Sequence, residues 1–193
     1  NSPFSMPADR PLETLLGIMR GFDGNVTLIG GEPTLRHDLM PLIRRAKDQV
    51  PQHKLSLGTN GQKLKDIEFV RQLQDHGLDF VFLSLNDLAY EETQAVWENK
   101  IAALENCHRL RILVWLQRTV DRLPQADSLV PLLERHGEVI FNITLRVVKP
   151  FGLVHPDADF YVSDILRHLG SEHESGKGTS PFNRWIRWHR KKV

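Results

Sequence analysis

A run of two glycines, a glutamate and a proline follows a stretch of the chain that is typical of a β-strand. The run is Gly30-Gly31-Glu32-Pro33, and the stretch before it is residues 25–29. Glycines let the backbone approach a ligand closely, a carboxylate accepts hydrogen bonds from an ammonium group, and proline fixes the direction in which the chain leaves. The run therefore indicates a loop that binds a ligand with a positive amino group. A plain turn that carries a solvated acid is the alternative.

Two further polar clusters occupy equivalent places along the chain. Thr59 and Asn60 follow the β-type residues 54–57, and Ser84 and Asn86 lie at the end of the next β-type stretch. In a parallel sheet, the loops that follow the strands meet at one edge, which is where ligands bind. Taken alone, an Asn-Gly pair is ordinary turn chemistry, and a serine in a strand often bonds to the backbone. Their common edge favours a shared binding function.

The elements that must position these loops alternate regularly. Strands are predicted over residues 25–29, 54–57, 80–85, 111–120 and 139–148, and helices over residues 9–20, 38–46, 67–76, 91–106, 128–136 and 162–169. Strands that are nearly continuous apolar runs, separated by amphipathic helices, predict an α/β fold with a parallel sheet. The first helix, capped by Asp9 and ended by Gly21, has no strand before it. We therefore expect the first strand of a βα repeat to be missing from the chain.

The order and spacing of three motifs resemble the radical S-adenosylmethionine (radical SAM) superfamily. The motifs are VTLIGGEPT at 26–34, LGTNG at 57–61 and FLSLN at 82–86, with looser matches in QRTV at 117–120 and TLRVVKPFG at 144–152. The resemblance covers residues 1–170. It implies a partial (β/α)6 TIM-like barrel in which the five predicted strands are the second to the sixth, which accounts for the unaccompanied first helix.

The resemblance also implies two cofactors, S-adenosylmethionine and a 4Fe-4S cluster. In the family, a CxxxCxxC loop after the first strand holds the cluster through three thiolates, and the remaining iron binds the methionine moiety. The chain has one cysteine, Cys107, which lies on a predicted helix and is expected to be an inert, partly buried thiol. Asn1-Ser2-Pro3 resembles the segment after the third cysteine, so we expect the cluster ligands just before Asn1. Without a cluster, this chain alone is expected to be inactive.

The residues expected to bind the cofactor share the carboxyl edge of the sheet. They are Gly30, Gly31, Glu32, Pro33, Thr59, Asn60, Ser84, Asn86, Gln117 and Thr119. By similarity, Glu32 receives the methionyl ammonium, and Ser84 contacts the carboxylate or ribose. Asn86 stands where many relatives carry Asp, which puts a charge-dependent role there in doubt. Arg146 is expected to bind an anionic substrate group or the cofactor carboxylate, with a strand-end ion pair as the alternative.

The implied reaction is one-electron cleavage of S-adenosylmethionine to a 5'-deoxyadenosyl radical, which removes a hydrogen atom from an unidentified substrate. A ferredoxin or flavodoxin is the expected reductant. A competing hypothesis is a barrel without a cluster that binds S-adenosylmethionine or a nucleotide as a regulatory module. Three cysteines encoded upstream of Asn1 would favour the enzyme, and their absence would favour the binding module.

Composition excludes several other classes. The 193 residues are 40% hydrophobic and 25% charged with a net charge of +1, which is typical of a globular domain and predicts no general affinity for nucleic acid or membranes. A single cysteine excludes an internal disulfide and a cysteine-based zinc site. No apolar run reaches the ~18 residues of a membrane span, and a cytoplasmic location is expected. The scattered histidines predict no metal site.

The last residues of the chain differ in character from the rest. Residues 171–193 read as a linker and a basic, aromatic tail in which Trp185 and Trp188 alternate with arginines and lysines. Such a tail can stack on bases and pair with phosphates, which would associate the protein with nucleic acid. The favoured alternative is that the tryptophans cover the open end of the barrel.

Overall fold

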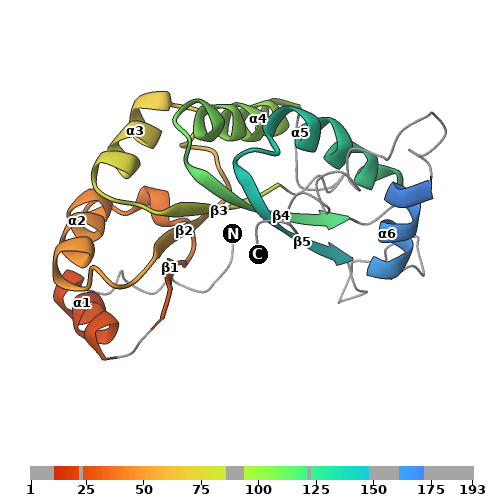
Figure 1. Ribbon diagram of the computed structural model, residues 1–193. Helices are drawn as coiled ribbons and strands as arrows, with labels where there is room; N and C mark the ends of the chain where they lie inside the picture. Colours follow the sequence, from red (N-terminus) through yellow and green to blue (C-terminus); the bar gives the residue numbers. More distant parts are fainter. Residues whose placement is uncertain (1–10, 22–23, 86–93, 121–122, 148–160, 172–193) are drawn as a thin grey trace, which may run out of the picture.

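Strands and helices alternate along the chain, as the sequence predicts. The computed structural model describes residues 11–21, 24–85, 94–120, 123–147 and 161–171. Within them lie five strands and six α-helices: α1 (Leu12–Arg20), β1 (Val26–Leu28), α2 (Leu39–Gln49), β2 (Leu55–Thr59), α3 (Ile67–Asp75), β3 (Phe80–Ser84), α4 (Gln94–Arg109), β4 (Leu113–Val120), α5 (Leu129–His136), β5 (Ile140–Val147) and α6 (Val162–Ser171) (Figure 1). Two short 3-10 helices, η1 (Pro33–Leu35) and η2 (Leu123–Ser128), stand where the sequence predicts loops.

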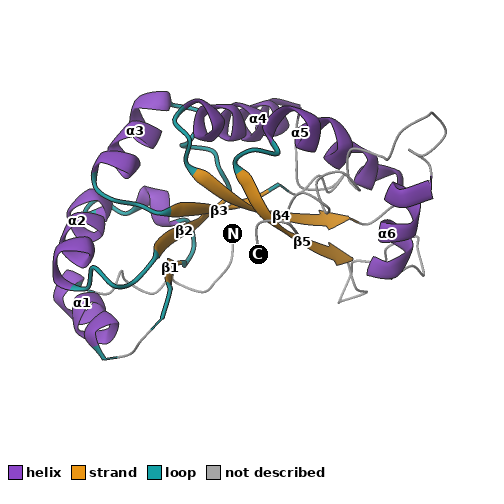
Figure 2. Ribbon diagram, in the orientation of Figure 1, coloured by secondary structure: helices purple, strands orange, loops and turns teal. Residues whose placement is uncertain are grey.

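The sheet is parallel throughout, and its strand order is the order of the chain, β1-β2-β3-β4-β5. Each βα crossover therefore advances by one strand in the same direction. Because such crossovers are right-handed, the helices come to lie on one side of the sheet, and a twisted sheet built this way curves toward a barrel. Figure 2 shows the helices arranged in an arc outside the strands. A doubly wound sheet would instead reverse its strand order, so the partial barrel is confirmed.

The two faces of the sheet differ in chemistry. Along β4, the side chains of Val114 and Leu116 face the helices and are fully buried, whereas Trp115, Gln117 and Thr119 face the inside of the curve and stay partly exposed. This is the period-two alternation of a strand with one face in the core. The inner face, where polar side chains remain accessible, is therefore where a ligand can bind.

The turn after β2 begins later than the sequence predicts. Gly58 and Thr59 pair in register with Phe82 and Leu83, so the strand continues through them. The chain then turns at Gly61, which has a φ of +82°, and a Cβ there would lie 2.7 Å from Cδ1 of Leu83. Positive φ and the lack of space both require glycine at this position. The turn therefore rests firmly on the core beneath the candidate binding loop.

A β-bulge interrupts the pairing of β4 with β5. Val114 pairs with Ile140, but the next residue, Trp115, pairs with Asn142, so Phe141 is the extra residue. A bulge of one residue exchanges the faces of all the side chains that follow it. After the bulge, Ile143 and Leu145 pack against the core, and the residues between them turn to the inner face.

Cys107 and His53 are both buried inside the protein. Cys107 on α4 is fully buried, more so than the sequence suggests, and desolvation raises the pKa of its thiol to about 12. The ring of His53 is buried, with Nδ1 against the carbonyl oxygen of Gly24 and Nε2 3.0 Å from that of Met19. A protonated thiol and an imidazole enclosed by backbone carbonyls are core groups.

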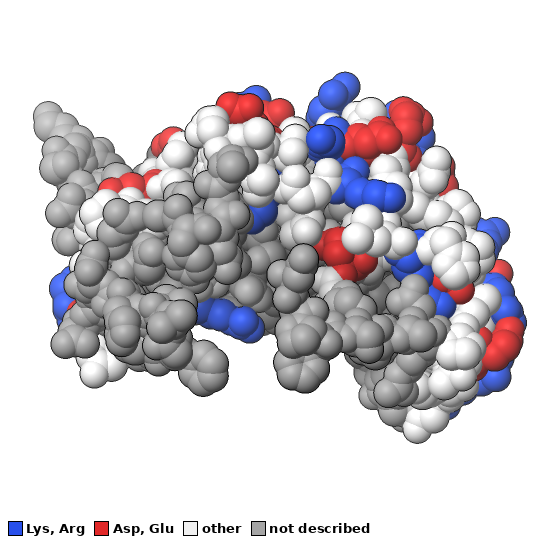
Figure 3. All heavy atoms as spheres, turned by 180° about the vertical axis from the view of Figure 1, so that it is seen from behind, with Lys and Arg blue, Asp and Glu red and all other residues white. Residues whose placement is uncertain are grey.

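Charges of both signs are mixed on the face of the molecule that Figure 3 shows. In Figure 3, acidic and basic side chains are interspersed over the part of this face that the structure describes, in keeping with the near-neutral net charge. Exposed pairs such as Arg71 with Glu68 and Arg44 with Asp48 contribute little to stability. Among the described residues, no helix is long and apolar enough to cross a membrane.

Two histidines meet between α4 and α5. The Nδ1 atoms of His108 and His136 lie 2.9 Å apart, so one nitrogen donates and the other accepts. His136 is 2% exposed, and its burial, followed by the nearby positive charges of His108 and Arg135, lowers its pKa to about 4, although Glu105 acts in the opposite direction. The folded protein therefore holds His136 in the neutral form.

We expect acid to destabilise the protein through His136. Its folded pKa of about 4 lies below the unfolded value of 6.5, so this contribution to stability is complete above pH 6.5 and is lost as the pH falls toward 4. The loss is about 2 to 3 kcal/mol. His136→Asn keeps a polar atom facing His108 without titrating. In urea denaturation, the free energy of unfolding of His136→Asn should fall less between pH 7 and pH 4 than that of the wild type. An equal fall in the two proteins would contradict the assignment.

Candidate functional site

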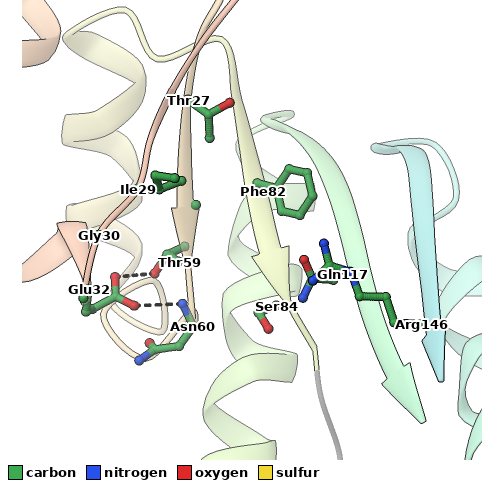
Figure 4. Close-up of a pocket in the computed structure, with 12 residues that line it drawn as sticks. Thr27, Ile29, Gly30, Glu32, Thr59, Asn60, Phe82, Ser84, Gln117 and Arg146 are labelled. Atoms are coloured by element: carbon green, nitrogen blue, oxygen red, sulfur yellow. Dashed lines mark hydrogen bonds between the residues drawn. The ribbon is translucent and has the colours of Figure 1, made fainter. Parts of the chain in front are cut away.

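A pocket opens on the inner face at the carboxyl ends of the strands. Its volume is about 510 Å³, and it extends across the sheet from β1 to β5 (Figure 4). The residues that line it are Thr27, Ile29, Gly30, Gly31, Glu32, Gly58, Thr59, Asn60, Phe82, Ser84, Gln117 and Arg146. A volume of this size suits a small-molecule ligand or cofactor.

Most of the residues proposed from the sequence lie in this pocket. Eight of them line it: Gly30, Gly31, Glu32, Thr59, Asn60, Ser84, Gln117 and Arg146. Pro33 begins η1 behind the binding loop, and Thr119 lies on the inner face of β4 outside the pocket lining. Asn86 falls outside the described residues, as does the tail after 171.

Four lining residues were not singled out in the sequence: Thr27, Ile29, Gly58 and Phe82. All four belong to β1, β2 and β3 or directly follow them, at positions that alternate with buried ones. Ile29 is 77% exposed, which is unusual for an isoleucine beside a sheet. Strand alternation, extended into the sheet from the polar loops, could have identified them.

Glu32 is held by four hydrogen bonds at one end of the pocket. Its Oε1 accepts from the backbone N–H of Thr34 at 3.2 Å, from the hydroxyl of Thr34 at 2.7 Å and from the hydroxyl of Thr59 at 2.7 Å. Its Oε2 accepts from the backbone N–H of Asn60 at 2.8 Å. The carboxylate thus joins the loop after β1 to the loop after β2 and fixes the geometry of both.

The partners of Glu32 are themselves committed to the turn. The hydroxyl of Thr59 donates to Glu32 and accepts from the N–H of Gly61 at 3.1 Å, and the side-chain oxygen of Asn60 accepts from the N–H of Gln62 at 2.9 Å. The side chain of Thr59 therefore supports the carboxylate. A carboxylate offers about four acceptor positions on two oxygens. Oε2 accepts from a single donor among the described residues, so it keeps capacity for another.

A second group of polar side chains lies at the opposite end of the pocket. Ser84 and Gln117 are register partners on β3 and β4, and Arg146 follows on β5, paired with Thr119. Gln117 and Arg146 lie side by side over the carboxyl half of β4 (Figure 4). The pocket therefore has a carboxylate at the β1–β2 end and a guanidinium at the β5 end, which suits a ligand with separated charges.

Arg118 supports this end of the pocket from behind. Its side chain has 0% exposure and faces the helices, where it donates to the carbonyl oxygens of Leu85 and Gln125 at 2.9 Å and to the hydroxyl of Ser128 at 3.0 Å. Its guanidinium carbon also lies 5.3 Å from the ring centre of Trp97. These contacts tie the end of β3 to η2, and they mark Arg118 as a positioning residue that the sequence did not reveal.

The part of the chain that the structure describes contains no group of three His, Cys, Asp or Glu residues arranged to hold a metal ion. The polar groups at the pocket are carboxylate, hydroxyl, amide and guanidinium groups. This set suits the amino-acid and ribose parts of S-adenosylmethionine, which carry an ammonium, a carboxylate and hydroxyls.

Relatives with known names match parts of this chain. A 7,8-dihydro-6-hydroxymethylpterin dimethyltransferase of Methanocaldococcus jannaschii is 39% identical over 64 residues, which cover 33% of this chain and 12% of the relative. A probable GTP 3',8-cyclase of Pyrococcus abyssi is 33% identical over 129 residues, which cover 64% of this chain and 40% of the relative. The chain therefore spans well under half the length of these two enzymes.

Solved structures share the fold. A structure of native anSMEcpe with bound AdoMet superposes on 93% of this chain and 56% of its own, with a TM-score of 0.57 and 16% identity. At that identity, the likeness concerns the fold. The family model of the Radical SAM superfamily matches residues 1–124, which are more than half of the chain. With its motifs, partial barrel and pocket, the chain belongs to the radical SAM superfamily.

Proposed function

We propose that this chain is the core of a radical SAM enzyme and binds S-adenosylmethionine in the pocket on its inner face. The observation that carries the proposal is the carboxylate of Glu32, which four hydrogen bonds fix at the pocket wall beside Gly30 and Gly31. A fixed carboxylate next to exposed backbone recognises an ammonium group at little cost in conformational entropy.

In this proposal, residues near the carboxyl ends of successive strands contact different parts of the cofactor. Oε2 of Glu32 and the backbone at Gly30 and Gly31 bind the methionyl ammonium. The hydroxyl of Ser84, at the centre of the sheet edge, binds the methionyl carboxylate or the ribose. The amide of Gln117 on the next strand contacts the ribose, since an amide can donate and accept toward a diol.

The family uses S-adenosylmethionine together with a 4Fe-4S cluster. When both are bound, they supply a 5'-deoxyadenosyl radical that removes a hydrogen atom from the substrate. The protein's part is to orient the sulfonium, to hold the substrate within reach and to keep water away. We propose a ferredoxin or flavodoxin as the electron donor and the cytoplasm as the location. The curated relatives are named for reactions on GTP and on a pterin, which supports a small-molecule substrate.

Cleavage of the cofactor tests this proposal. The protein expressed from its complete gene, reconstituted with iron and sulfide without oxygen and reduced with dithionite, should convert S-adenosylmethionine to 5'-deoxyadenosine and methionine. Liquid chromatography with mass spectrometry measures both products. Ser84→Ala should slow the conversion, whereas Ser163→Ala, on the exposed surface of α6, should not. A reduced, cluster-loaded protein that neither binds nor cleaves S-adenosylmethionine would overturn the proposal.

A further inference from the structure

The inner face carries a second set of binding groups that the cofactor assignment leaves unused. Arg146 is exposed at the β5 end of the pocket, and its guanidinium makes no hydrogen bond or ion pair with the residues that the structure describes. β2, which Asn60 directly follows, has two strands between it and β5, so the two lie about 14 Å apart along the sheet at about 4.8 Å per spacing. The pocket therefore has room for chemistry at Arg146 that is distinct from ammonium binding at Glu32.

The bulge in β5 is what directs Arg146 into the pocket. If the pairing continued from Val114 and Ile140 without a bulge, Arg146 would pair with Val120 and share its outward face, against the helices. With the bulge, Arg146 pairs with Thr119 on the inner face, and Leu145 turns to the core instead. Bulges that re-aim a side chain are common beside active sites. The local fold thus places a guanidinium on the concave face.

An aromatic floor lies beside this guanidinium. The rings of Phe82 and Trp115 are stacked with centres 5.1 Å apart, and Phe141 contacts Trp115 edge-on at 5.9 Å. Nε1 of Trp115 donates to the hydroxyl of Thr144 at 2.8 Å, which fixes the indole. Phe82 also lines the pocket. Fixed rings next to a pocket offer a planar ligand a stacking surface.

Gly58 keeps this surface open. It pairs with Phe82 across β2 and β3 and has no side chain on the inner face, where a Cβ would already meet Cγ2 of Ile29 at 3.0 Å. A larger residue here would crowd the space above Phe82. The floor is therefore bounded by Gly58 on one side and by the polar pair Gln117 and Arg146 on the other.

We propose that Phe82 and Arg146 form the substrate subsite and that it takes a small planar heteroaromatic ring bearing an anionic group. The ring lies on Phe82, and the guanidinium of Arg146 pairs with a phosphate or carboxylate. This placement rests on the proposed function, because a substrate here lies in the same pocket as the cofactor. Ligand binding to the subsite can nevertheless be measured without turnover.

Four probes separate the ring from the anion. Isothermal titration calorimetry of the protein expressed from its complete gene uses inosine 5'-monophosphate, orotate, inosine and ribose 5-phosphate. We expect Arg146→Gln to lower the affinity for inosine 5'-monophosphate at least tenfold if phosphate is the natural anion, or the affinity for orotate at least tenfold if carboxylate is. The affinity for inosine should not change. Phe82→Leu should lower the affinity for the probes that contain a ring and leave the affinity for ribose 5-phosphate unchanged. Arg71→Gln, an exposed arginine on α3, is the matched control and should change nothing.

Titration of S-adenosylmethionine into the same variants distinguishes this proposal from the proposed function. An unchanged cofactor affinity in Arg146→Gln, together with weaker anionic probes, supports the subsite. A cofactor affinity that falls while the probes are unaffected assigns Arg146 to the methionyl carboxylate and overturns the subsite but not the proposed function. Wild-type protein that binds none of the four probes also overturns it. Probe binding with these variant effects supports the subsite even where S-adenosylmethionine fails to bind.

Discussion

Replacing Arg118 by methionine is expected to lower the free energy of unfolding by about 3 to 4 kcal/mol, because it leaves buried acceptors without donors. The carbonyl oxygen of Leu85 and the hydroxyl of Ser128 both lose a charged donor within 3.0 Å. The ring of Trp97 also loses the guanidinium that lies against it. Methionine fills a similar volume, so the expected loss reports polar contacts more than packing.

The same substitution should weaken the pocket. Leu85 directly follows Ser84, and Arg118 directly follows Gln117, so the lost hydrogen bond loosens the two strands beside these pocket residues. We expect affinity for S-adenosylmethionine to fall severalfold even at temperatures where the variant is folded. The link is positional, because Arg118 itself faces the helices and does not line the pocket.

Chemical denaturation measures the effect of Arg118→Met. Arg44→Met, on the exposed face of α2, is the matched control and should stay within about 0.5 kcal/mol of the wild type. Arg118→Lys keeps the charge but loses the planar fork of the guanidinium. Its stability should therefore lie between that of Arg118→Met and that of Arg44→Met. A loss of less than 1 kcal/mol for Arg118→Met would show that water or neighbouring donors replace the guanidinium.

The sequence predicted the alternation of elements because its physical basis is local. Apolar residues at helical or alternating spacing define an element within ten residues, so every predicted strand and helix recurs with shifts of a few residues among those described. The 3-10 helices were not predicted, because a turn of three residues, such as Pro33–Leu35, is too short to show a hydrophobic period. Ends shifted where pairing decides them, as at Thr59, whose strand continues because Leu83 lies beside it.

The sequence could not predict contacts that depend on distant segments. Arg118 stands at an outward position of β4 where the alternation calls for an apolar residue, and that mismatch was the available signal. Its partners come from 33 residues before it and from 7 to 10 residues after it. The face of Arg146 likewise depends on the bulge at Phe141, and a slip of one residue in register leaves no trace in composition.

Glu32 also has a structural role, which the sequence motif did not predict. The motif placed it in the pocket, and the structure places it there. The motif did not show that Glu32 also joins two loops through Thr34, Thr59 and Asn60. In the proposed function, recognition of the ammonium and support of the loops use the same carboxylate, so a single truncation to alanine would disturb both at once. Separating the two roles requires variants that change the charge and the hydrogen bonds independently.

Glu32→Gln is expected to raise the dissociation constant for S-adenosylmethionine by about 10- to 100-fold, since a charge-assisted hydrogen bond is worth about 1.5 to 3 kcal/mol. The amide oxygen can still accept from Thr34 and Thr59, so the fold is expected to persist. Thr59→Val keeps the charge and removes one hydrogen bond of the loop junction. It should raise the dissociation constant less than fivefold.

Calorimetry with the protein expressed from its complete gene measures both variants, with Glu68→Gln on the exposed surface of α3 as the control for a lost charge elsewhere. A large effect of Glu32→Gln beside a small effect of Thr59→Val means that the negative charge itself binds the cofactor. Equal effects would mean that Glu32 acts by holding the two loops together, and the ammonium would then have to be bound by the backbone at Gly30 and Gly31. The comparison thus decides which atoms of the loop carry the recognition, because the two variants differ in charge while both alter the same junction.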